Sequence, residues 1–273
     1  MKKIFMTSQG PVYDVDILSA LRNIGITAGD TIFVHSRLYV FGQLADVKTK
    51  EELADAFVDA LIQSVGNGTV VMPTFTFSFC KTGIYDSEKT VSEAGLLSEV
   101  FRKRQGVIRS SHPIYSVAIW GKNKDYFLDA DTTTCFGDDG IFGRVHKKGD
   151  VKILFIGIGA DGLSQIHYVE ELLKVPYRYM KRFLGKSNGN SVEVDFYVRD
   201  LENEAELDMK GKFVSFCEER KLLKTVPLGN HFISCMQESL VHKQMVDAMR
   251  KNPCVFLKNE YKSIVRNHPI NAR

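Results

Sequence analysis

Apolar residues in the first 180 positions follow two alternating patterns. Stretches with helical spacing end at a glycine or carry basic residues in their last turn, and short continuous apolar runs lie between them. Such alternation is typical of a fold in which helices connect the strands of a partly parallel sheet. We expect helices at 15–25, 50–66, 92–106 and 164–174, strands at 31–34, 68–77 and 151–159, and a loop followed by a strand within 108–121.

The pattern changes after Tyr179. Residues 191–202 alternate between apolar and polar positions, as an antiparallel strand does. A helix is expected at 213–224, and a strand followed by a helix within 229–253. We therefore predict a mixed α/β fold with a central, partly parallel sheet flanked by helices. A single domain would span residues 1–273, with a smaller inserted α+β lobe at about 185–225.

Composition narrows the class of protein. The chain has 273 residues, of which 44% are hydrophobic, enough for a sizeable core. It has no apolar run long enough to insert into a membrane, no secretory signal, and five scattered cysteines without a CxxC pair. A cytoplasmic protein with reduced thiols is expected. The net charge of +3 is mild, and no basic block is interleaved with aromatics, so nucleic acid is not an expected partner.

Polar residues follow the ends of the first two predicted strands. Ser36 lies in VHSRLYVFG, where a hydroxyl and free backbone N–H groups suit a phosphate or a carbonyl oxygen. Thr74, Phe75 and Thr76 lie in MPTFTF, where they would line a cleft. The alternatives are a polar turn with a satisfied His35 in the first case and a half-buried edge strand in the second.

A third polar group precedes the strand predicted within 108–121. Arg109, Ser110 and His112 lie in RSSHP, and arginine beside small hydroxyls suits a phosphate of a nucleotide-like cofactor. The alternative is a loop with an exposed arginine. The glycine-rich segment 135–150 is too irregular for a Walker A loop or a dinucleotide fingerprint, which leaves a mobile loop at a pocket or an ordinary turn.

The helix predicted after the strand at 151–159 carries the most distinct chemistry. Glu170 stands three residues after His167 and therefore shares its helix face, and Glu171 lies close to that face. A carboxylate beside one imidazole suits a general base, and N–H groups near Ser164 suit an oxyanion. A surface histidine on a helix capped by Ser164 is the alternative. Zinc on a helix usually requires a second histidine one turn away, so no metal is expected.

These motifs together resemble the antibiotic N-acetyltransferase family, which includes the aminoglycoside 3-N-acetyltransferases. The similarity is carried by VHSRLYVFG, MPTFTF, IRSSHPIYSVAIWG, CFGDDGIFG and ILFIGIGADGLSQIHYVEELLKVPYRY in this order. It covers about residues 17–180, with a weaker similarity at 226–252. The resemblance implies an N-acyltransferase that moves an acyl group from acyl-CoA to an amine on a sugar-like ring.

The same resemblance implies a role for each candidate residue. His167 would be the base, Glu170 would orient it or bind the ammonium, and Ser164 would steady the thioester carbonyl or its oxyanion. Residues implied to contact coenzyme A are His35, Ser36, Arg37, Arg109, Ser110 and His112. Residues implied to contact the acceptor are Thr74, Phe75, Thr76, Glu171 and Tyr177.

Two features bear on the acceptor. This chain has Gly140-Ile141 where the family commonly has Ser-Pro, and its positive charge suits an acceptor with phosphates better than a polycationic aminoglycoside. We therefore expect an N-acyltransferase for a dTDP- or UDP-linked amino sugar of surface polysaccharide biosynthesis. An aminoglycoside 3-N-acetyltransferase that confers antibiotic resistance is the alternative, and a binding protein without turnover is another. The acyl group would be acetyl or a short hydroxyacyl chain, and a homodimer is compatible with the sequence.

Overall fold

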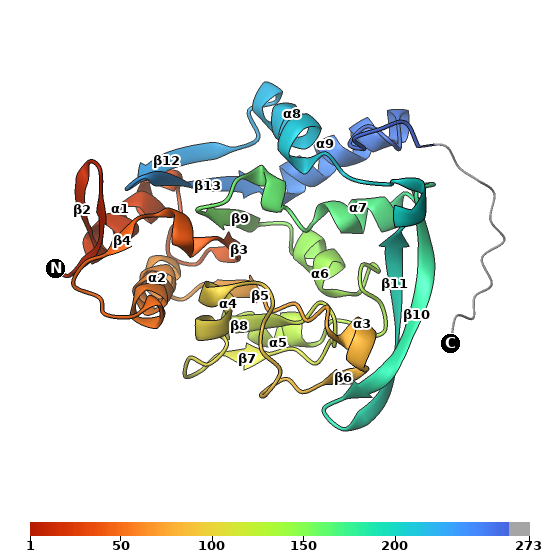
Figure 1. Cartoon of the computed structure of the whole chain (residues 1–273), viewed down its shortest axis with the longest axis horizontal. Coiled ribbons are helices and arrows are strands. Elements are labelled where there is room, and N and C mark those ends of the chain that lie inside the picture. The colour runs from red at the N-terminus through yellow and green to blue at the C-terminus, as the bar shows by residue number, and fades with distance from the viewer. Residues whose placement is uncertain (262–273) are drawn as a thin grey trace.

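The computed structural model describes residues 1–261, which form a mixed α/β fold around a seven-stranded sheet (Figure 1). β3 runs parallel to both of its neighbours, β5 and β9, and the other adjacent pairs are antiparallel. The predicted fold class, with a partly parallel central sheet between helices, is confirmed. In spatial order the strands are β12 (Lys224–Leu228), β13 (His231–Gln237), β9 (Val151–Ile156), β3 (Thr31–Ser36), β5 (Thr69–Pro73), β8 (Val117–Gly121) and β7 (Ile108–Arg109).

Both faces of the sheet are covered, which explains why its parallel strands are continuous apolar runs. Ile32 and Val34 pack on one face with α1 (Asp14–Ile24), α2 (Lys50–Val65) and α4 (Leu96–Phe101). Phe33, on the opposite face, packs with α6 (Ile141–Lys148). α7 (Ile166–Leu172) and α9 (Glu238–Lys251) cover the β9 and β13 part of that second face.

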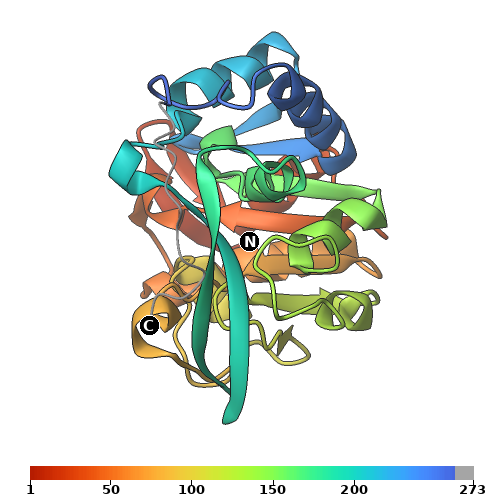
Figure 2. The same ribbon diagram turned by 90° about the vertical axis from the view of Figure 1, so that its right-hand side faces the viewer.

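A long hairpin of β10 (Arg178–Ser187) and β11 (Asn190–Arg199) runs along one side of the molecule. Figure 2 shows this hairpin crossing in front of the central sheet. Asn188 and Gly189 form its turn and both have positive φ, as a tight hairpin turn requires. Phe196 packs edge-on against Tyr115, so the hairpin closes an aromatic cluster on the second face of the sheet.

The structure adds elements that the hydrophobic pattern did not predict. The helix expected at 92–106 is shorter, because Gly95 with φ near 110° delays its start until Leu96.

β1 (Lys3–Thr7), β2 (Gly10–Tyr13) and β4 (Gln43–Leu44) form a small sheet, and β6 (Ile84–Tyr85) joins the hairpin. The remaining elements are η1 (Leu38–Val40), α3 (Phe79–Thr82), α5 (Lys124–Leu128), η2 (Ala160–Gly162), η3 (Leu201–Asn203), a π-helical turn (Met209–Phe213) and α8 (Val214–Glu219).

Residues 185–225, expected as an inserted lobe, hold the end of β10, all of β11, η3, the π-helical turn, α8 and the start of β12. α8 packs through Phe216 and Cys217 into the same cluster as α7 and α9. Among residues 1–261, the helices are too short or too polar for any to cross a bilayer.

Candidate active site

The carboxyl ends of the parallel strands meet at one edge of the sheet. Ser36, the last residue of β3, pairs with Ile156, the last residue of β9, and the Arg37 N–H donates to the Ile156 carbonyl at 2.8 Å. The segment after β9 leads through η2 into α7. Residues that follow two different strands are thereby placed side by side. This edge, at the carboxyl ends of the strands, is where ligands bind in open α/β sheets.

Three side chains form a tight cluster at the start of α7 and of β10. His167 Nδ1 lies 2.7 Å from Glu170 Oε2, as expected for positions three residues apart on a helix. Arg178 Nη2 lies 2.6 Å from the same carboxylate oxygen and 2.9 Å from His167 Nδ1. The predicted pair of His167 and Glu170 is therefore present in the geometry, with an arginine as its third member.

The charges of this cluster determine its protonation. Burial alone would raise the pKa of Glu170, but the Arg178 guanidinium and the hydrogen bond with His167 lower it below its ordinary value. Burial of the imidazole, together with the charge of Arg178, lowers the pKa of His167. At pH 7 the histidine is therefore neutral and the glutamate ionised. A guanidinium only donates and a carboxylate only accepts, so Nδ1 can form a hydrogen bond with one of the two. With the Arg178 Nη2 hydrogen donated to Glu170 Oε2, its nearer partner, Nδ1–H donates to Glu170 and Nε2 carries the lone pair. The approach of Nη2 to Nδ1 is then a contact and not a hydrogen bond.

His167 is the most accessible member of the cluster. Its side chain is 23% exposed, whereas the Glu170 carboxylate is fully buried. A cavity of about 200 Å³ opens beside it. That cavity is lined by Asp161, Ser164, His167, Arg199, Leu207 and Met209, among others. A basic ring nitrogen at the wall of a cavity, with its partner carboxylate sealed behind it, suits proton abstraction from a ligand.

Sequence patterns did not identify Arg178. It stands eleven residues after His167, beyond a turn at Pro176, and reaches the cluster only because the hairpin starts there. Its Nη1 donates to the Tyr197 carbonyl at 2.6 Å across the base of the hairpin. The segment VPYRY contains a proline before an arginine, but this local pattern does not indicate where the strand after it would go.

Ser36 and Arg37 line a second cavity of about 560 Å³. Lys50 at the start of α2 adds a second cation, and Tyr39 adds an aromatic ring that is 83% exposed. Glu93 is the acidic residue among its lining. Two cations and an open aromatic ring are the groups that a nucleotide with phosphates would contact.

The remaining residues implied to contact coenzyme A lie in the interior. His35 is buried between Phe33 and Phe155 on the second face of the sheet. His112 is buried, and its Nδ1 accepts from two backbone N–H groups. Ser110 is also buried, and its hydroxyl accepts from the Val117 N–H. His112 and Ser110 thus bond to the backbone, whereas His35 Nε2 is buried without a hydrogen-bond partner. None of the three lines the cavity that contains Ser36 and Arg37.

Arg109 belongs to the same buried network. Its Nε donates to the Thr74 hydroxyl at 3.0 Å, its Nη2 donates to the Thr74 carbonyl at 2.6 Å, and its Nη1 donates to the Thr90 carbonyl. All three guanidinium nitrogens are thus engaged within the protein. The expectation of a phosphate contact came from the arginine beside the serines of RSSHP. In the structure Ser110 bonds to the backbone, and Arg109 donates instead to the Thr74 and Ser116 hydroxyls.

Replacing Arg109 should therefore affect stability. We expect Arg109→Met to lower the free energy of unfolding by about 2–3 kcal/mol, because buried carbonyl oxygens lose a charged donor. Arg182→Met, which breaks exposed ion pairs on the hairpin, should cost about 0.5 kcal/mol or less. Urea unfolding measures both. A coenzyme A Kd that weakens in folded Arg109→Met without loss of stability would instead support the phosphate contact.

The residues implied to contact the acceptor differ in their exposure. Thr76 is fully buried and its hydroxyl donates to the Pro113 carbonyl, and Phe75 is buried among aromatic rings. Tyr177 is fully buried, and burial together with the nearby Glu170 raises the pKa of its phenol. Glu171 is partly exposed, and its Oε2 has no hydrogen-bond partner. Of these residues, Glu171 is the one that reaches solvent.

Buried histidines make the fold sensitive to acid. Burial lowers the pKa of His35 to about 3, so the folded state resists a proton that the unfolded chain accepts near pH 6.5. The contribution of neutral His35 to the free energy of unfolding is therefore present above pH 6.5 and is lost as the pH falls. From pH 6.5 to 5 the loss is about 2 kcal/mol for one such histidine. His35→Phe should reduce the difference in unfolding free energy between pH 7 and 5 by this amount; an unchanged difference would contradict it.

Comparison with known proteins places this geometry in a family. The family model for aminoglycoside 3-N-acetyltransferase matches residues 33–250. The chain is 24% identical to aminoglycoside N(3)-acetyltransferase IV of Salmonella over 243 residues, which is 89% of each chain. It is 27% identical to the aminoglycoside N(3')-acetyltransferase-like protein YokD of Bacillus subtilis, over 65% of this chain and 71% of that protein.

Solved structures share the fold. The apoenzyme of aminoglycoside acetyltransferase AAC(3)-IVa superposes with a TM-score of 0.72 at 22% identity, covering 91% of this chain and 92% of that one. AAC-IIIb, whose structure was solved as a binary complex with coenzyme A, gives a TM-score of 0.72 at 20% identity, covering 90% and 98%. The architecture is therefore that of these acetyltransferases.

Proposed function

Because this chain belongs to the aminoglycoside 3-N-acetyltransferase family, we propose that it transfers an acetyl group from acetyl-CoA to an amine of an aminoglycoside. The observation that carries the proposal is the cluster of His167, Glu170 and Arg178, which presents a neutral imidazole at the wall of a cavity. The relatives' names support the acceptor. One family structure, of AAC(3)-IVa, holds a gentamicin in a variant with a histidine replaced by alanine.

The nucleotide-linked amino sugar expected from the net charge gains no support from these relatives. The four curated relatives are named as aminoglycoside acetyltransferases or as a protein similar to them. A net charge of +3 describes the whole chain and does not fix the sign of one cleft. The cavity beside His167 is lined by one acid, Asp161, and one base, Arg199, so its charge favours neither acceptor and the proposal rests on the relatives.

The proposed reaction removes two protons from the acceptor nitrogen and includes one nucleophilic attack. Sugar amines are largely protonated at pH 7, so the ammonium must lose a proton before its nitrogen attacks. His167 Nε2 takes that proton while Nδ1–H remains bonded to Glu170. The free amine attacks the thioester carbonyl carbon, and the tetrahedral oxyanion collapses as the C–S bond breaks. The acceptor nitrogen releases its second proton to solvent as the amide forms. The imidazolium then returns a proton to the departing thiolate.

Two further residues have proposed tasks in this reaction. The Ser164 hydroxyl lines the same cavity as His167 and would donate to the oxyanion. Glu171 would pair with an acceptor ammonium, since its buried Oε2 is unpartnered. Burial, opposed by Arg178, raises the pKa of Glu171 to about 7, so a bound cation would also favour its ionised form.

Coenzyme A is proposed to lie in the cavity at the end of β3. Arg37 and Lys50 supply positive charge for its phosphates, and Tyr39 supplies an exposed ring for its base. We expect Lys50→Ala to raise the KM for acetyl-CoA about tenfold with little change in kcat. Lys48→Ala, an exposed lysine outside this cavity, should leave KM unchanged. Equal effects in the two variants would refute this placement.

The acceptor class is tested by release of the coenzyme A thiol. Purified protein and acetyl-CoA would be mixed with kanamycin- and gentamicin-type aminoglycosides, and in parallel with dTDP- and UDP-linked amino sugars. The proposal expects acceptor-dependent release with at least one aminoglycoside and none with the nucleotide-linked sugars. The reverse pattern would restore the acceptor first expected from the sequence.

A further inference from the structure

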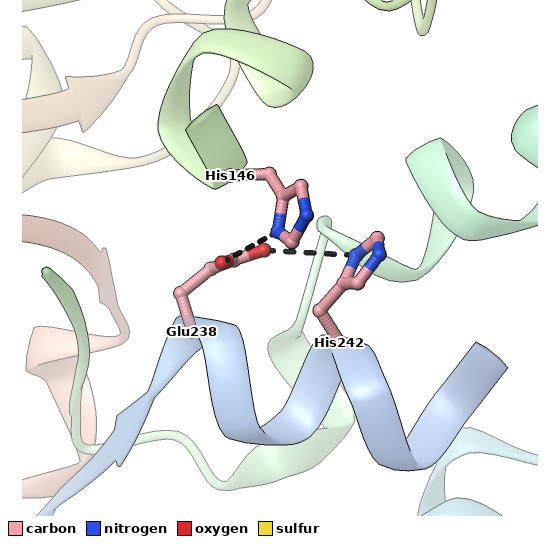
Figure 3. A group of neighbouring side chains, drawn as sticks. All are labelled: His146, Glu238 and His242. Carbon is pink, nitrogen blue, oxygen red and sulfur yellow. Dashed lines mark hydrogen bonds and ion pairs between the residues drawn. The ribbon is translucent and has the colours of Figure 1, made fainter. Parts of the chain in front are cut away.

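Three potential metal ligands meet between α6 and α9. His146 lies near the end of α6, while Glu238 and His242 lie one turn apart at the start of α9 and point toward it (Figure 3). One nitrogen of each histidine and a carboxylate oxygen lie within 4.8 Å of one another. None of the three lines the cavity beside His167. The proposed acetyl transfer does not use this cluster.

The distances in the cluster match those between ligands of one ion. Glu238 Oε2 lies 3.1 Å from His146 Nδ1, and Glu238 Oε1 lies 3.8 Å from His242 Nδ1. Ligands at about 2.0–2.2 Å from a tetrahedral zinc ion are about 3.3 Å apart, between these two values. The two rings are stacked with centroids 3.6 Å apart, so one ring must turn about its side-chain torsions to direct both Nδ1 lone pairs at the same ion.

His242 carries an unused ligand atom. Its side chain is 9% exposed, and its Nδ1 is buried without a hydrogen-bond partner. The nearest carboxylate oxygen, at 3.8 Å, is too far for a hydrogen bond but suits a shared cation. A buried polar atom normally has a partner, so this nitrogen directed at a buried carboxylate needs an explanation.

A further residue orients the carboxylate. Gln165, which is buried just before α7, donates from Nε2 to Glu238 Oε1 at 2.9 Å and to the Phe142 carbonyl at 2.8 Å. Ligating carboxylates are commonly held by such hydrogen bonds. The link also joins the cluster to α7, the helix that carries His167.

We propose that His146, Glu238 and His242 bind one Zn²⁺ ion, which clamps α6 to α9. Two imidazole nitrogens and one carboxylate oxygen are a donor set that zinc prefers. His146 is 31% exposed, so water reaches the fourth position. Binding displaces the hydrogen between His146 Nδ1 and Glu238, and this proton leaves to solvent. The ion is structural, because its ligands lie apart from the proposed catalytic base.

The test uses the full-length chain without an affinity tag, stripped with EDTA and dialysed. Titration with zinc chloride by calorimetry should give one Zn²⁺ per chain, with a rise in melting temperature. His146→Ala, at a partly exposed position that tolerates truncation, and His242→Leu, which keeps the buried volume, should each lose the binding. Gln165→Ala should weaken it about tenfold by freeing the carboxylate.

His231→Ala is the control, because His231 lies at the start of β13 outside the cluster. Zinc affinity and the melting shift should persist in this variant. Circular dichroism verifies that each variant is folded. Zinc binding retained by both His146→Ala and His242→Leu would overturn the proposal, as would a wild-type chain that binds no stoichiometric zinc.

Discussion

His167→Ala is expected to lower kcat for acetyl transfer by about 10²–10⁴-fold, the usual contribution of a positioned general base. The variant lacks the one basic nitrogen that the cluster presents to its cavity, so an acceptor ammonium must lose its proton to water. Binding of coenzyme A should persist with a Kd within about twofold, since Arg37 and Lys50 lie in the other cavity. Turnover measured by thiol release and a Kd from calorimetry report the two effects separately.

The control for this variant is His231→Ala, which removes a histidine elsewhere and should retain wild-type turnover. The pH profile adds a second readout. Because burial and Arg178 lower the pKa of His167, the neutral base persists below pH 6.5, and the acid limb of kcat should lie below that value. Near wild-type turnover in His167→Ala would remove the histidine from the mechanism.

Glu170→Gln is expected to lower the free energy of unfolding by about 3–5 kcal/mol, the cost of leaving a buried charge without its partner. The Arg178 side chain is 3% exposed and the Glu170 side chain is fully buried, so water does not replace the lost carboxylate charge. Turnover should fall as well, because an amide no longer requires the proton to stay on His167 Nδ1. Urea unfolding measures the stability.

The second variant in this series removes both charges. Glu170→Gln combined with Arg178→Met should recover part of the stability lost in Glu170→Gln alone, since no unpaired cation remains. An exposed pair serves as the reference: Glu219→Gln, beside Arg220, should change stability by about 0.5 kcal/mol or less. If Glu170→Gln proves as mild as Glu219→Gln, the buried ion pair does not stabilise the fold.

The helices and strands that the sequence predicted well are those determined by their own order of apolar, charged and glycine residues. α2 has Glu51 and Glu52 in its first turn and ends before Gly66, and β9 is apolar except for Lys152 and is buried on both faces. β10 has no such pattern. It carries Lys181, Arg182 and Lys186, and it is a strand because β11 pairs with it residue by residue. The Asn-Gly turn between the two strands was the local signal for this hairpin.

The residues of the candidate site also fall into those that local spacing predicts and those that the tertiary structure places. His167 and Glu170 lie within one helical turn, so their spacing predicts their contact. Arg178 depends on where the hairpin starts, which is a tertiary property. Arg109 and Thr74 show the opposite case: polar residues beside a strand end were interpreted as ligand contacts, yet they bond to each other in the interior. Residue type alone does not say whether a polar side chain faces inward.

The most direct test of the proposed function is acetyl transfer itself. Wild-type protein is supplied with acetyl-CoA, with and without an aminoglycoside, and thiol release is followed alongside the mass of the acceptor. We predict release that depends on the aminoglycoside, with one acetyl amide formed for each thiol released and no acetylated enzyme. Release no faster with any aminoglycoside than with acetyl-CoA alone, by protein that binds coenzyme A, would contradict the proposed function.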